Sequence, residues 1–258
     1  MAPNDHTTRF SVRTPYYHQY RPRYPQGVLR VMEGFGLTPQ SVIADVGAGT
    51  GISSELFLNY GATVYAIEPN PDMRAVAEHY YDALPNCTVL NGTAEATTLP
   101  ADSVDFVVAG QAFHWFDHRA ARVEFERILR PGGSVVLMWS YRKDGTSSFI
   151  DHFNAALEKY DTDKAASPRA KGMLQTDDDI AAFFGSAGFE KAEIPNPVVY
   201  DWDGLRGRAL SASYVPLPGH PDHDAFIADL RAVFDRHQVD GTVTMDYVTQ
   251  VYWGKIGA

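Results

Sequence analysis

The sequence predicts an α/β protein built on a doubly wound, mostly parallel sheet. Between residues 41 and 140, short and almost continuously apolar segments alternate with amphipathic ones, which is the pattern of parallel strands joined by helices. A glycine cluster directly follows the first apolar segment, where folds of this class bind their ligands. With 258 residues, 45% of them hydrophobic and 21% charged, the chain is long enough for one large domain with a sizeable core.

Five strands and three helices are predicted in the first part of the chain. The strands are short apolar runs, and the helices carry apolar residues at spacings of three and four. Pro131-Gly-Gly133 is a stop signal between the last of these helices and the strand after it. In chain order we expect strand 41–46, helix 53–60, strand 62–67, helix 72–83, strands 87–90 and 105–109, helix 119–129 and strand 134–139.

The remaining segments complete the sheet and cover it. Predicted here are helices 147–160, 176–184 and 224–237, strands 198–202 and 243–252, and an exposed polar turn at 161–168. Residues 1–40, rich in Tyr, Arg and Pro, are expected to form an ordered cap outside the core. We therefore divide one structural domain into an N-terminal cap (1–40), a ligand-binding core (41–140) and a C-terminal part (141–258) with a helical cap on the substrate side.

Composition excludes several classes of protein. The chain has 22 Lys and Arg against 32 Asp and Glu, a net charge of −10, which argues against a nucleic-acid partner. The single cysteine, Cys87, excludes an intrachain disulfide and a cysteine-based zinc cluster. The first nine residues lack the apolar core of a signal peptide, and runs such as 135–139 are too short to cross a bilayer. We expect a cytoplasmic protein that does not bind membranes.

The glycine loop Asp45-Val-Gly-Ala-Gly-Thr-Gly51 is the first motif with chemical content. Glycines permit positive φ and carry no Cβ, so a ligand can lie against the backbone while the next helix presents free N–H groups. The spacing is G-x-G-x-G, with Ile52 where a dinucleotide fingerprint has its third glycine. A phosphate-binding Gly-Lys-Ser/Thr sequence does not follow. The loop therefore favours a ligand other than a dinucleotide or a nucleoside triphosphate.

Two carboxylates suggest the chemistry of that ligand. Glu68 lies at the end of the second strand, 17 residues after Gly51, where a carboxylate can accept both hydroxyls of a ribose. Asp45 precedes the glycines, and its charge suits a cationic amine but would repel a pyrophosphate. S-adenosylmethionine has an α-amino group, a ribose and an adenine, and it has no phosphate.

At this point the chain resembles the class I S-adenosylmethionine-dependent methyltransferases. The resemblance rests on four motifs within about residues 40 to 140: the glycine loop, Glu68, Gly92-Thr-Ala-Glu95 and Leu129-Arg-Pro-Gly-Gly133. It implies a seven-stranded, Rossmann-like sheet whose last strand, 243–253, runs antiparallel. It also implies S-adenosylmethionine as cofactor, S-adenosylhomocysteine as product, and no metal.

The resemblance assigns positions around the cofactor. The glycine loop would hold the methionine end, the acidic residue before it would reach the amino group, and the second acidic residue would bind the ribose. The cofactor-binding residues so implied are Asp45, Gly47, Ala48, Gly49, Gly51, Glu68, Pro69, Met73, Ala94, Glu95 and Gln111.

A second segment, 107–117, follows the fourth strand and should face the transferring methyl group. Its His114-Trp115 is similar to the His-Trp motif of the trans-aconitate-type methyltransferases, and to the corresponding segment of plant and insect carboxyl methyltransferases. In the latter group the tryptophan N–H donates to the substrate carboxylate, helped by a glutamine from the N-terminal segment. Carried over, Trp115 is the donor and Gln19 the second. His114 is either a general base or a packed or cofactor-facing histidine.

The resemblance implies methyl transfer to a small-molecule acceptor. A carboxylate oxygen is the leading acceptor, and a hydroxyl, nitrogen or carbon of a natural-product scaffold is the nearest alternative. Two rivals come from other classes: a nicotinamide oxidoreductase, which the glycine spacing disfavours, and a cofactor-binding module without activity. A monomer or a homodimer is expected.

Two further features stay outside the predicted site. Histidines recur at 114 and 118 and at 220 and 223, but two ligands without a third do not predict a metal. Arg206 and Arg208 could bind an anionic acceptor, because guanidinium suits carboxylate. Arginines of this kind are more often solvated helix residues, which is what we expect here.

Overall fold

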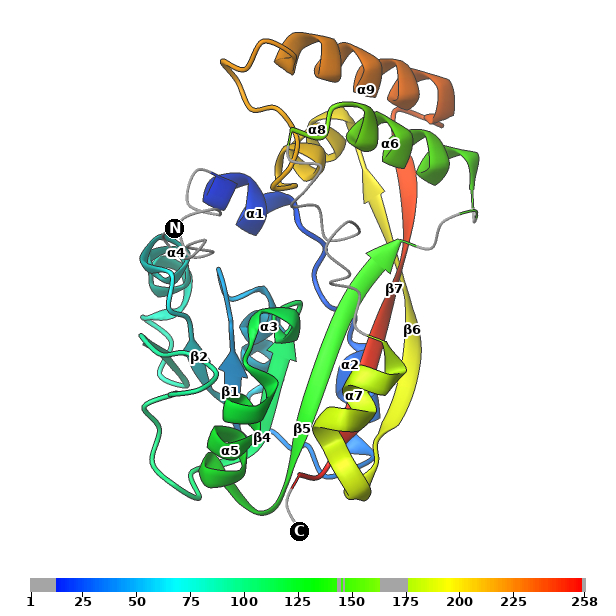
Figure 1. Cartoon of the computed structure of the whole chain (residues 1–258). Coiled ribbons are helices and arrows are strands. Elements are labelled where there is room, and N and C mark those ends of the chain that lie inside the picture. The colour runs from blue at the N-terminus through cyan, green and yellow to red at the C-terminus, as the bar shows by residue number, and fades with distance from the viewer. Residues whose placement is uncertain (1–12, 143–144, 146, 163–175, 257–258) are drawn as a thin grey trace.

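The sheet has seven strands in the order β3-β2-β1-β4-β5-β7-β6 (Figure 1). The computed structural model describes residues 13–142, 145, 147–162 and 176–256. The strands are β1 Val42–Val46, β2 Thr63–Ile67, β3 Cys87–Leu90, β4 Val104–Gly110, β5 Leu129–Arg142, β6 Glu190–Tyr200 and β7 Val243–Gly254. β1 to β5 pair in parallel, and β7 runs antiparallel to both β5 and β6. The mostly parallel seven-stranded sheet and its antiparallel last strand are thus confirmed.

The strand order reverses between β1 and β4. β1 pairs with β2 on one side and with β4 on the other, and the chain crosses from one half of the sheet to the other at this point. Ligands of doubly wound sheets bind beyond the carboxyl ends of the strands at such a reversal. The glycine loop after β1 and the His-Trp segment after β4 therefore both lie at the expected position.

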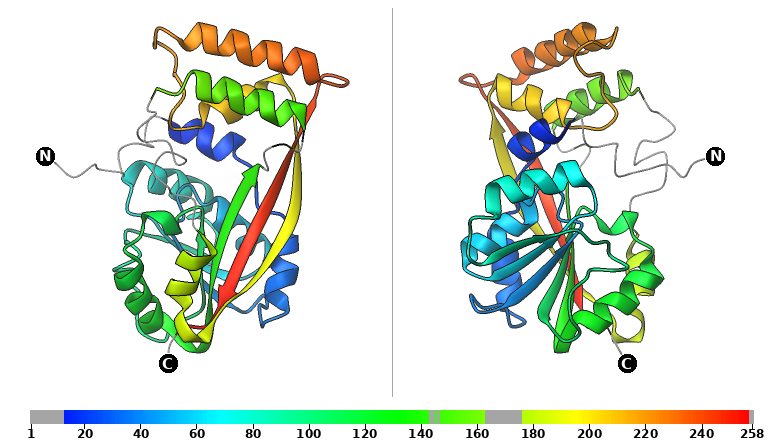
Figure 2. Two further views of the ribbon diagram at one scale, coloured as in Figure 1. Left: turned by 45° about the vertical axis from the view of Figure 1, so that its right-hand side comes forward. Right: turned by 90° about the vertical axis from the view of Figure 1, so that its left-hand side faces the viewer.

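Helices cover both faces of the sheet (Figure 2). In the described residues they are α1 Thr14–Tyr20, α2 Gly27–Glu33, α3 Ile52–Tyr60, α4 Pro71–Tyr81, α5 His118–Ile128, α6 Ser148–Lys159, α7 Asp177–Phe184, α8 Trp202–Leu210 and α9 His223–His237, with short 3₁₀ turns η2 Phe113–Trp115 and η3 Gly185–Ala187. Side chains of the type that predicts helix starts cap several of them. Thr176 forms a capping box with Asp179 at α7, and Asn70 caps α4.

Three clusters of buried side chains hold the fold together. Val28, Phe57 and Phe106 belong to the cluster between α2, α3 and one face of the sheet. Phe125 and Phe184 belong to the cluster between α5, α7 and the other face. A third cluster, which we call the cap cluster, joins α6, α8 and α9 to the extended ends of β6 and β7; it includes Phe149, Phe153, Leu205, Phe226, Met245 and Tyr247. β7 contributes to all three clusters, so it connects the core to the cap.

β5 begins earlier than predicted, at Leu129 and not at Ser134. Pro131-Gly-Gly133 is a bulge inside the strand: the pairing register shifts between Val104↔Leu129 and Phe106↔Ser134. The proline and glycines thus mark an irregularity in the strand and not a loop before it.

β6 and α8 also differ from the prediction. β6 begins at Glu190 and not at Val198. It is an edge strand whose residues alternate between exposed and half-buried, so its first half contains no apolar run that would predict a strand. Trp202 starts α8 and does not end the strand. α8 was not predicted because its two glycines lower helix propensity. Gly207 is required there: a Cβ on it would lie 2.3 Å from the Tyr20 ring.

The N-terminal segment is only partly a cap. Val28, Leu29 and Met32 of α2 are buried in the core, so the expectation that this whole segment lies outside the core is wrong for α2. α1 instead lies against α8 and α4, above the carboxyl ends of the parallel strands (Figures 1 and 2). Residues 1–12 and most of the predicted polar turn, 163–168, lie outside the described residues. In the described part of the chain, no helix combines the length and the apolar character needed to cross a bilayer.

Candidate active site

The glycine loop between β1 and α3 has the backbone that its sequence predicts. Gly47, Gly49 and Gly51 all have positive φ, at 70°, 60° and 85°. A Cβ on Gly47 would lie 2.6 Å from the Cβ of Ala112, and one on Gly51 would lie 2.3 Å from the Tyr81 ring. Glycine is therefore required at both positions by conformation and by space. The amides of Gly47 and Ala48 donate to the Ile67 carbonyl, which joins the loop to the end of β2.

Asp45, at the end of β1, is completely buried. Its Oδ2 accepts hydrogen bonds from the hydroxyls of Ser53 (2.7 Å) and Ser54 (2.6 Å), whereas its Oδ1 has no partner among the described residues. Burial raises the pKa of this carboxyl to about 6, although both serines act to lower it. An enclosed carboxylate oxygen without a donor suits the cationic amino group of a ligand.

Glu68 connects the glycine loop to the start of α4. Its Oε2 accepts from the Gly49 amide and its Oε1 from the Asn70 amide, both at 2.8 Å. Burial raises the pKa of the Glu68 carboxyl, and the two amide donors oppose that effect. Each carboxylate oxygen keeps a second lone pair, so the group can still accept from a ligand hydroxyl. The carboxylate predicted to bind a ribose thus also shapes the loop beside it.

The other residues expected around the cofactor differ in their burial and in their contacts with the glycine loop. Met73 is buried, and its Sδ lies 3.7 Å from the position of a Cβ on Gly49, directly against the loop. Pro69 is half-buried beside Glu68, and Ala94 is part of the core. The carboxylate of Glu95 accepts from the Asp117 amide (2.9 Å), which ties the segment after β3 to the start of α5.

Gln111 follows β4 in an unusual conformation. Its φ is +59°, which residues other than glycine seldom adopt. Its Nε2 donates to the Ser140 carbonyl (2.6 Å) and its amide N–H to the Met138 carbonyl (2.8 Å). Both bonds tie Gln111 to β5. The strained turn redirects the chain into η2, so Gln111 positions the His-Trp segment.

His114 and Trp115 lie in η2, with ring centroids 4.8 Å apart. Ala112 and Phe116, on either side of η2, pack against Gly47, so this segment borders the glycine loop. The Nδ1 of His114 is buried without a partner. Burial, and then the neighbouring His118, lower the pKa of His114 to about 4, so its imidazole is neutral at pH 7. Trp115 is half-buried.

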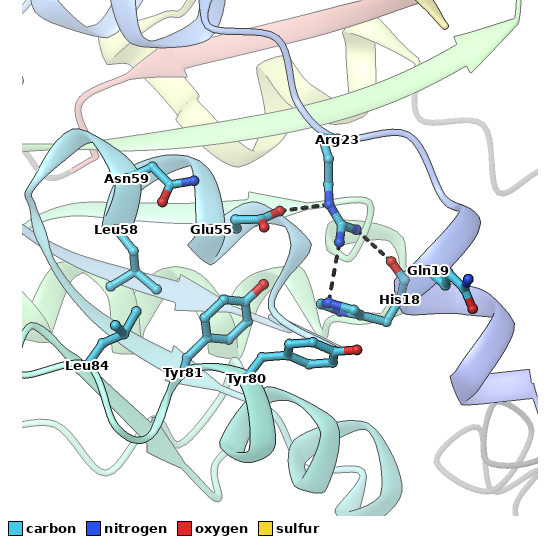
Figure 3. Close-up of a pocket in the computed structure, with 9 residues that line it drawn as sticks. All are labelled: His18, Gln19, Arg23, Glu55, Leu58, Asn59, Tyr80, Tyr81 and Leu84. Atoms are coloured by element: carbon cyan, nitrogen blue, oxygen red, sulfur yellow. Dashed lines mark hydrogen bonds and ion pairs between the residues drawn. The ribbon is translucent and has the colours of Figure 1, made fainter. Parts of the chain in front are cut away.

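Gln19 lies in the last turn of α1. It is exposed on α1 and lines a pocket of about 400 Å³ between α1, α3 and α4 (Figure 3). Arg23 crosses this pocket, pairing with Glu55 at 2.7 Å and contacting His18 (Figure 3). The lining of the pocket does not include Trp115, and the pairing of Gln19 with Trp115 stays a prediction.

The structure corrects the expectation for one arginine. Arg206 is exposed and pairs with Asp203, as expected of a solvated helix residue. Arg208 is only 5% exposed and donates to the Tyr247 hydroxyl at 2.7 Å, so it is buried and not solvated. The apolar residues around it, Leu205 and Leu210, are the sequence signal that could have indicated burial. Arg21, which adjoins Arg208, was not recognised at all. Among the described residues, no group of three or more His, Cys, Asp or Glu is placed to hold a metal.

Comparison with known proteins finds relatives of the segment that contains the glycine loop and Glu68. Residues 44–137 match the family of methyltransferase domains. An uncharacterised methyltransferase-like protein of Schizosaccharomyces pombe is 31% identical over 165 residues, which are 63% of each chain. An uncharacterised methyltransferase of Mycobacterium tuberculosis is 36% identical over 142 residues, which are 54% of this chain and 55% of that one. The chain thus spans between about half and two thirds of the length of these relatives.

Solved structures show the fold. An S-adenosylmethionine-dependent methyltransferase from Geobacter sulfurreducens, solved with S-adenosylhomocysteine, superposes with a TM-score of 0.53 at 15% identity and covers 97% of this chain and 98% of its own. A candidate methyltransferase of an antibiotic biosynthesis pathway in Anabaena variabilis gives a TM-score of 0.62 at 22% identity, covering 93% and 100%. The chain therefore has the fold of the class I S-adenosylmethionine-dependent methyltransferases, and its residues 44–137 match a methyltransferase domain.

Proposed function

We propose that this protein transfers the methyl group of S-adenosylmethionine to a small-molecule acceptor, and that the leading acceptor atom is a carboxylate oxygen. The observation that carries the proposal is a glycine loop with positive φ that Glu68 braces, directly after the buried carboxylate of Asp45. This combination suits one cationic amine and one ribose, and the charge of Asp45 would repel a phosphate. The methyltransferase-domain match over residues 44–137 supports the same conclusion.

The residues present fit the cofactor. Asp45 would receive the amino group, Glu68 the ribose hydroxyls, and the positive-φ glycines would allow the ligand to lie against the loop. When bound, S-adenosylmethionine supplies an electrophilic methyl group, whose transfer to a carboxylate oxygen gives a methyl ester and S-adenosylhomocysteine. The chain's own contribution is to bind both molecules, orient them and exclude water.

The neighbourhood of His114 favours a carboxylate acceptor. A hydroxyl or phenol acceptor must lose a proton, which calls for a general base with a pKa near the working pH. His114, with a pKa of about 4, is too weak a base for that task. A carboxylate is already ionised at pH 7 and needs only orientation, which the indole N–H of Trp115 would supply. The net charge of −10 favours a small molecule over a nucleic acid as acceptor.

Calorimetric titration of the purified protein with S-adenosylmethionine, S-adenosylhomocysteine and NADH tests the proposal. We expect both sulfur compounds to bind with micromolar dissociation constants and NADH not to bind. Binding of NADH alone would favour the nicotinamide oxidoreductase instead. If the sulfur compounds bind, a screen of small carboxylic acids for methyl esters by mass spectrometry follows, and hydroxyl, amine and carbon acceptors serve as the comparison set.

A further inference from the structure

Two arginines, the buried Arg208 and the half-buried Arg21, meet where the N-terminal segment contacts the cap. Arg21 follows α1, and Arg208 lies on α8. Both donate to the hydroxyl of Ser211, from the Nε of Arg21 at 3.1 Å and the Nη1 of Arg208 at 3.3 Å. Arg21 also donates from Nη2 to the Ser211 carbonyl (3.2 Å), and Arg208 from Nε to the Tyr247 hydroxyl (2.7 Å). One shared acceptor therefore holds two guanidinium groups side by side.

No carboxylate balances this pair in the described part of the chain. None of the ion pairs formed there includes Arg21 or Arg208. The groups whose charges act on Arg21 are Arg208 and three tyrosines, and those on Arg208 are also tyrosines. Burial and then the charge of Arg208 lower the pKa of Arg21.

A third guanidinium adds to the positive charge. Arg142, at the end of β5, lies with its guanidinium carbon 5.9 Å from the centre of the Tyr247 ring, at the same distance as that of Arg208. It bonds to the neutral amide of Asn154 and not to an acid. Grouping partly desolvated cations without counter-charges is costly unless an anion completes the site.

The two guanidiniums have donors to spare. Each carries five N–H groups, of which the bonds described above use two. The Nη2 of Arg208 and the Nη1 of Arg21 donate to no described atom. Two adjacent guanidinium forks match the geometry of an oxyanion.

The pair lies on the side of the cap that faces the strand ends. The guanidinium of Arg21 lies over the Tyr17 ring, 4.6 Å from its centre. Tyr24 connects this region to the cofactor side: the charges of Asp45 and Arg21 both act on it, and its hydroxyl lies 2.8 Å from where a Cβ on Gly110, the last residue of β4, would be. Figure 1 shows α1 and α8 above these strand ends.

We propose that Arg21 and Arg208 bind an oxyanion of the methyl acceptor, a carboxylate or a phosphate, which is not the group that takes the methyl. The inference rests on the proposed methyl transfer and extends it to the recognition of the acceptor. An oxygen held by two guanidiniums has its lone pairs engaged and is a weak nucleophile. The pair is therefore suited to hold one anionic group while another oxygen of the same molecule reaches the reacting position near Trp115.

The test uses thermal unfolding and calorimetry with succinate and inorganic phosphate as probes, against sodium chloride at matched ionic strength. In the wild-type protein we expect a saturable rise in Tm with succinate, or with phosphate, that chloride does not give. Arg208→Met should weaken the binding of that probe by about tenfold or more, and Arg208→Lys by less, because lysine keeps the charge and loses the fork. Arg206→Met, two residues away on the exposed side of α8, should bind the probe like the wild type.

The stability and the probe affinity of the variants together separate binding from a structural role. If the pair only clamps the segment around Ser211, Arg208→Met should lower Tm without a probe and leave the affinity for the probe unchanged; an oxyanion site predicts that the probe affinity falls whether or not Tm changes. Equal responses to succinate, phosphate and chloride in the wild type, or equal probe affinity in wild type and both Arg208 variants, would overturn the proposal. Titration with S-adenosylhomocysteine reports separately on the proposed function, since both Arg208 variants should bind it like the wild type.

Discussion

At the scale of single residues, Asp45 shows a conflict between stability and binding. The side chain of an unfolded aspartate has an ordinary pKa of 3.8, whereas Asp45 in the folded chain has a pKa of about 6. Asp45 therefore keeps its proton up to a higher pH in the folded state than in the unfolded state, and its ionisation opposes folding. The loss of folding free energy caused by this ionisation is absent below pH 3.8 and grows as the pH rises towards 6. Above that pH it is constant, at about 3 kcal/mol for a pKa shift of this size.

Replacing Asp45 with asparagine should therefore stabilise the protein and weaken the binding of S-adenosylhomocysteine. The gain in Tm over the wild type should be small at pH 4, increase up to about pH 6 and then level off. For the wild type, affinity for S-adenosylhomocysteine should increase between pH 5 and pH 7, because the ligand amine needs the ionised carboxylate. Differential scanning calorimetry and titration across this range measure both effects. A gain in Tm that does not depend on pH would contradict the assignment.

Glu68→Ala should weaken the binding of S-adenosylhomocysteine by more than about tenfold, or about 1.4 kcal/mol. The variant loses an acceptor for the ribose and the carboxylate that holds the amides of Gly49 and Asn70. Glu78→Ala is the matched control, because Glu78 lies on α4 with a side chain that is 49% exposed. Calorimetry on both variants decides the matter: an unchanged dissociation constant for Glu68→Ala removes this residue from the site.

Trp115→Phe tests the acceptor side of the site. Phenylalanine keeps the aromatic packing of η2 and removes the N–H that would donate to the acceptor carboxylate. Turnover with a confirmed acceptor should fall, while the dissociation constant for S-adenosylhomocysteine should stay within about twofold of the wild type. Steady-state kinetics with calorimetry on the same preparation separates the two quantities. A turnover equal to that of the wild type would show that Trp115 is not the donor.

At the scale of elements, the glycine loop is held against α4. Gly51 and Gly132 both have positive φ, at 85° and 87°, but a Cβ on Gly132 meets no atom within 4 Å, whereas one on Gly51 meets the buried Tyr81 ring. The two glycines therefore separate the cost of backbone conformation from the cost of crowding.

Gly51→Ala should destabilise the protein more than Gly132→Ala. Both substitutions should destabilise the protein by about 1–2 kcal/mol because alanine disfavours the left-handed conformation. Gly51→Ala should cost about 1–3 kcal/mol more because its Cβ displaces the Tyr81 ring. Urea unfolding gives both free energies. Equal losses would mean that α4 moves away from the loop at little cost.

Most elements could be predicted from local pattern, and the exceptions have physical reasons. Buried strands such as Val42–Val46 are almost continuously apolar, and helices such as α9 repeat apolar residues at helical spacing, so both can be predicted from the sequence. β6 was cut short because an edge strand needs little apolar surface. α8 has no clear helical pattern because it contains two glycines, of which Gly207 serves contact with Tyr20 of α1, and no local pattern reveals that contact.

At the scale of the whole molecule, the proximity of the proposed cofactor-binding residues could be predicted, and that of the two arginines could not. Asp45 and the glycines lie at the end of β1 and Glu68 lies at the end of the neighbouring β2, so their proximity follows from the topology of the sheet. Arg21, Arg208 and Tyr247 come from three distant parts of the chain and meet only because α1 and the cap fold over the strand ends. Their juxtaposition depends on tertiary packing and leaves no local signal.

Saturating S-adenosylhomocysteine should stabilise the core and the cap together, because we expect the two parts to unfold cooperatively. A ligand at a hundred times its dissociation constant contributes about 2.7 kcal/mol, which for a chain of this size raises Tm by about 5–10 °C. Because β7 belongs to the core and cap clusters alike, the rise should be the same by fluorescence of the tryptophans and by circular dichroism. NADH at the same concentration is the control. Different shifts by the two probes would mean that the cap unfolds separately.

The outer edge of the sheet has a consequence for behaviour at high concentration. β6 is the last strand in the order, and it carries Pro195 and Pro197, which still keep register with Val248 and Asp246 of β7. Proline lacks an N–H, and residues two apart point their backbone groups to the same side, so two successive donors are missing from the free side of this strand. A second chain therefore finds no continuous ladder to extend there. These two prolines protect the longest exposed edge of the sheet from the strand-to-strand growth that leads to aggregation.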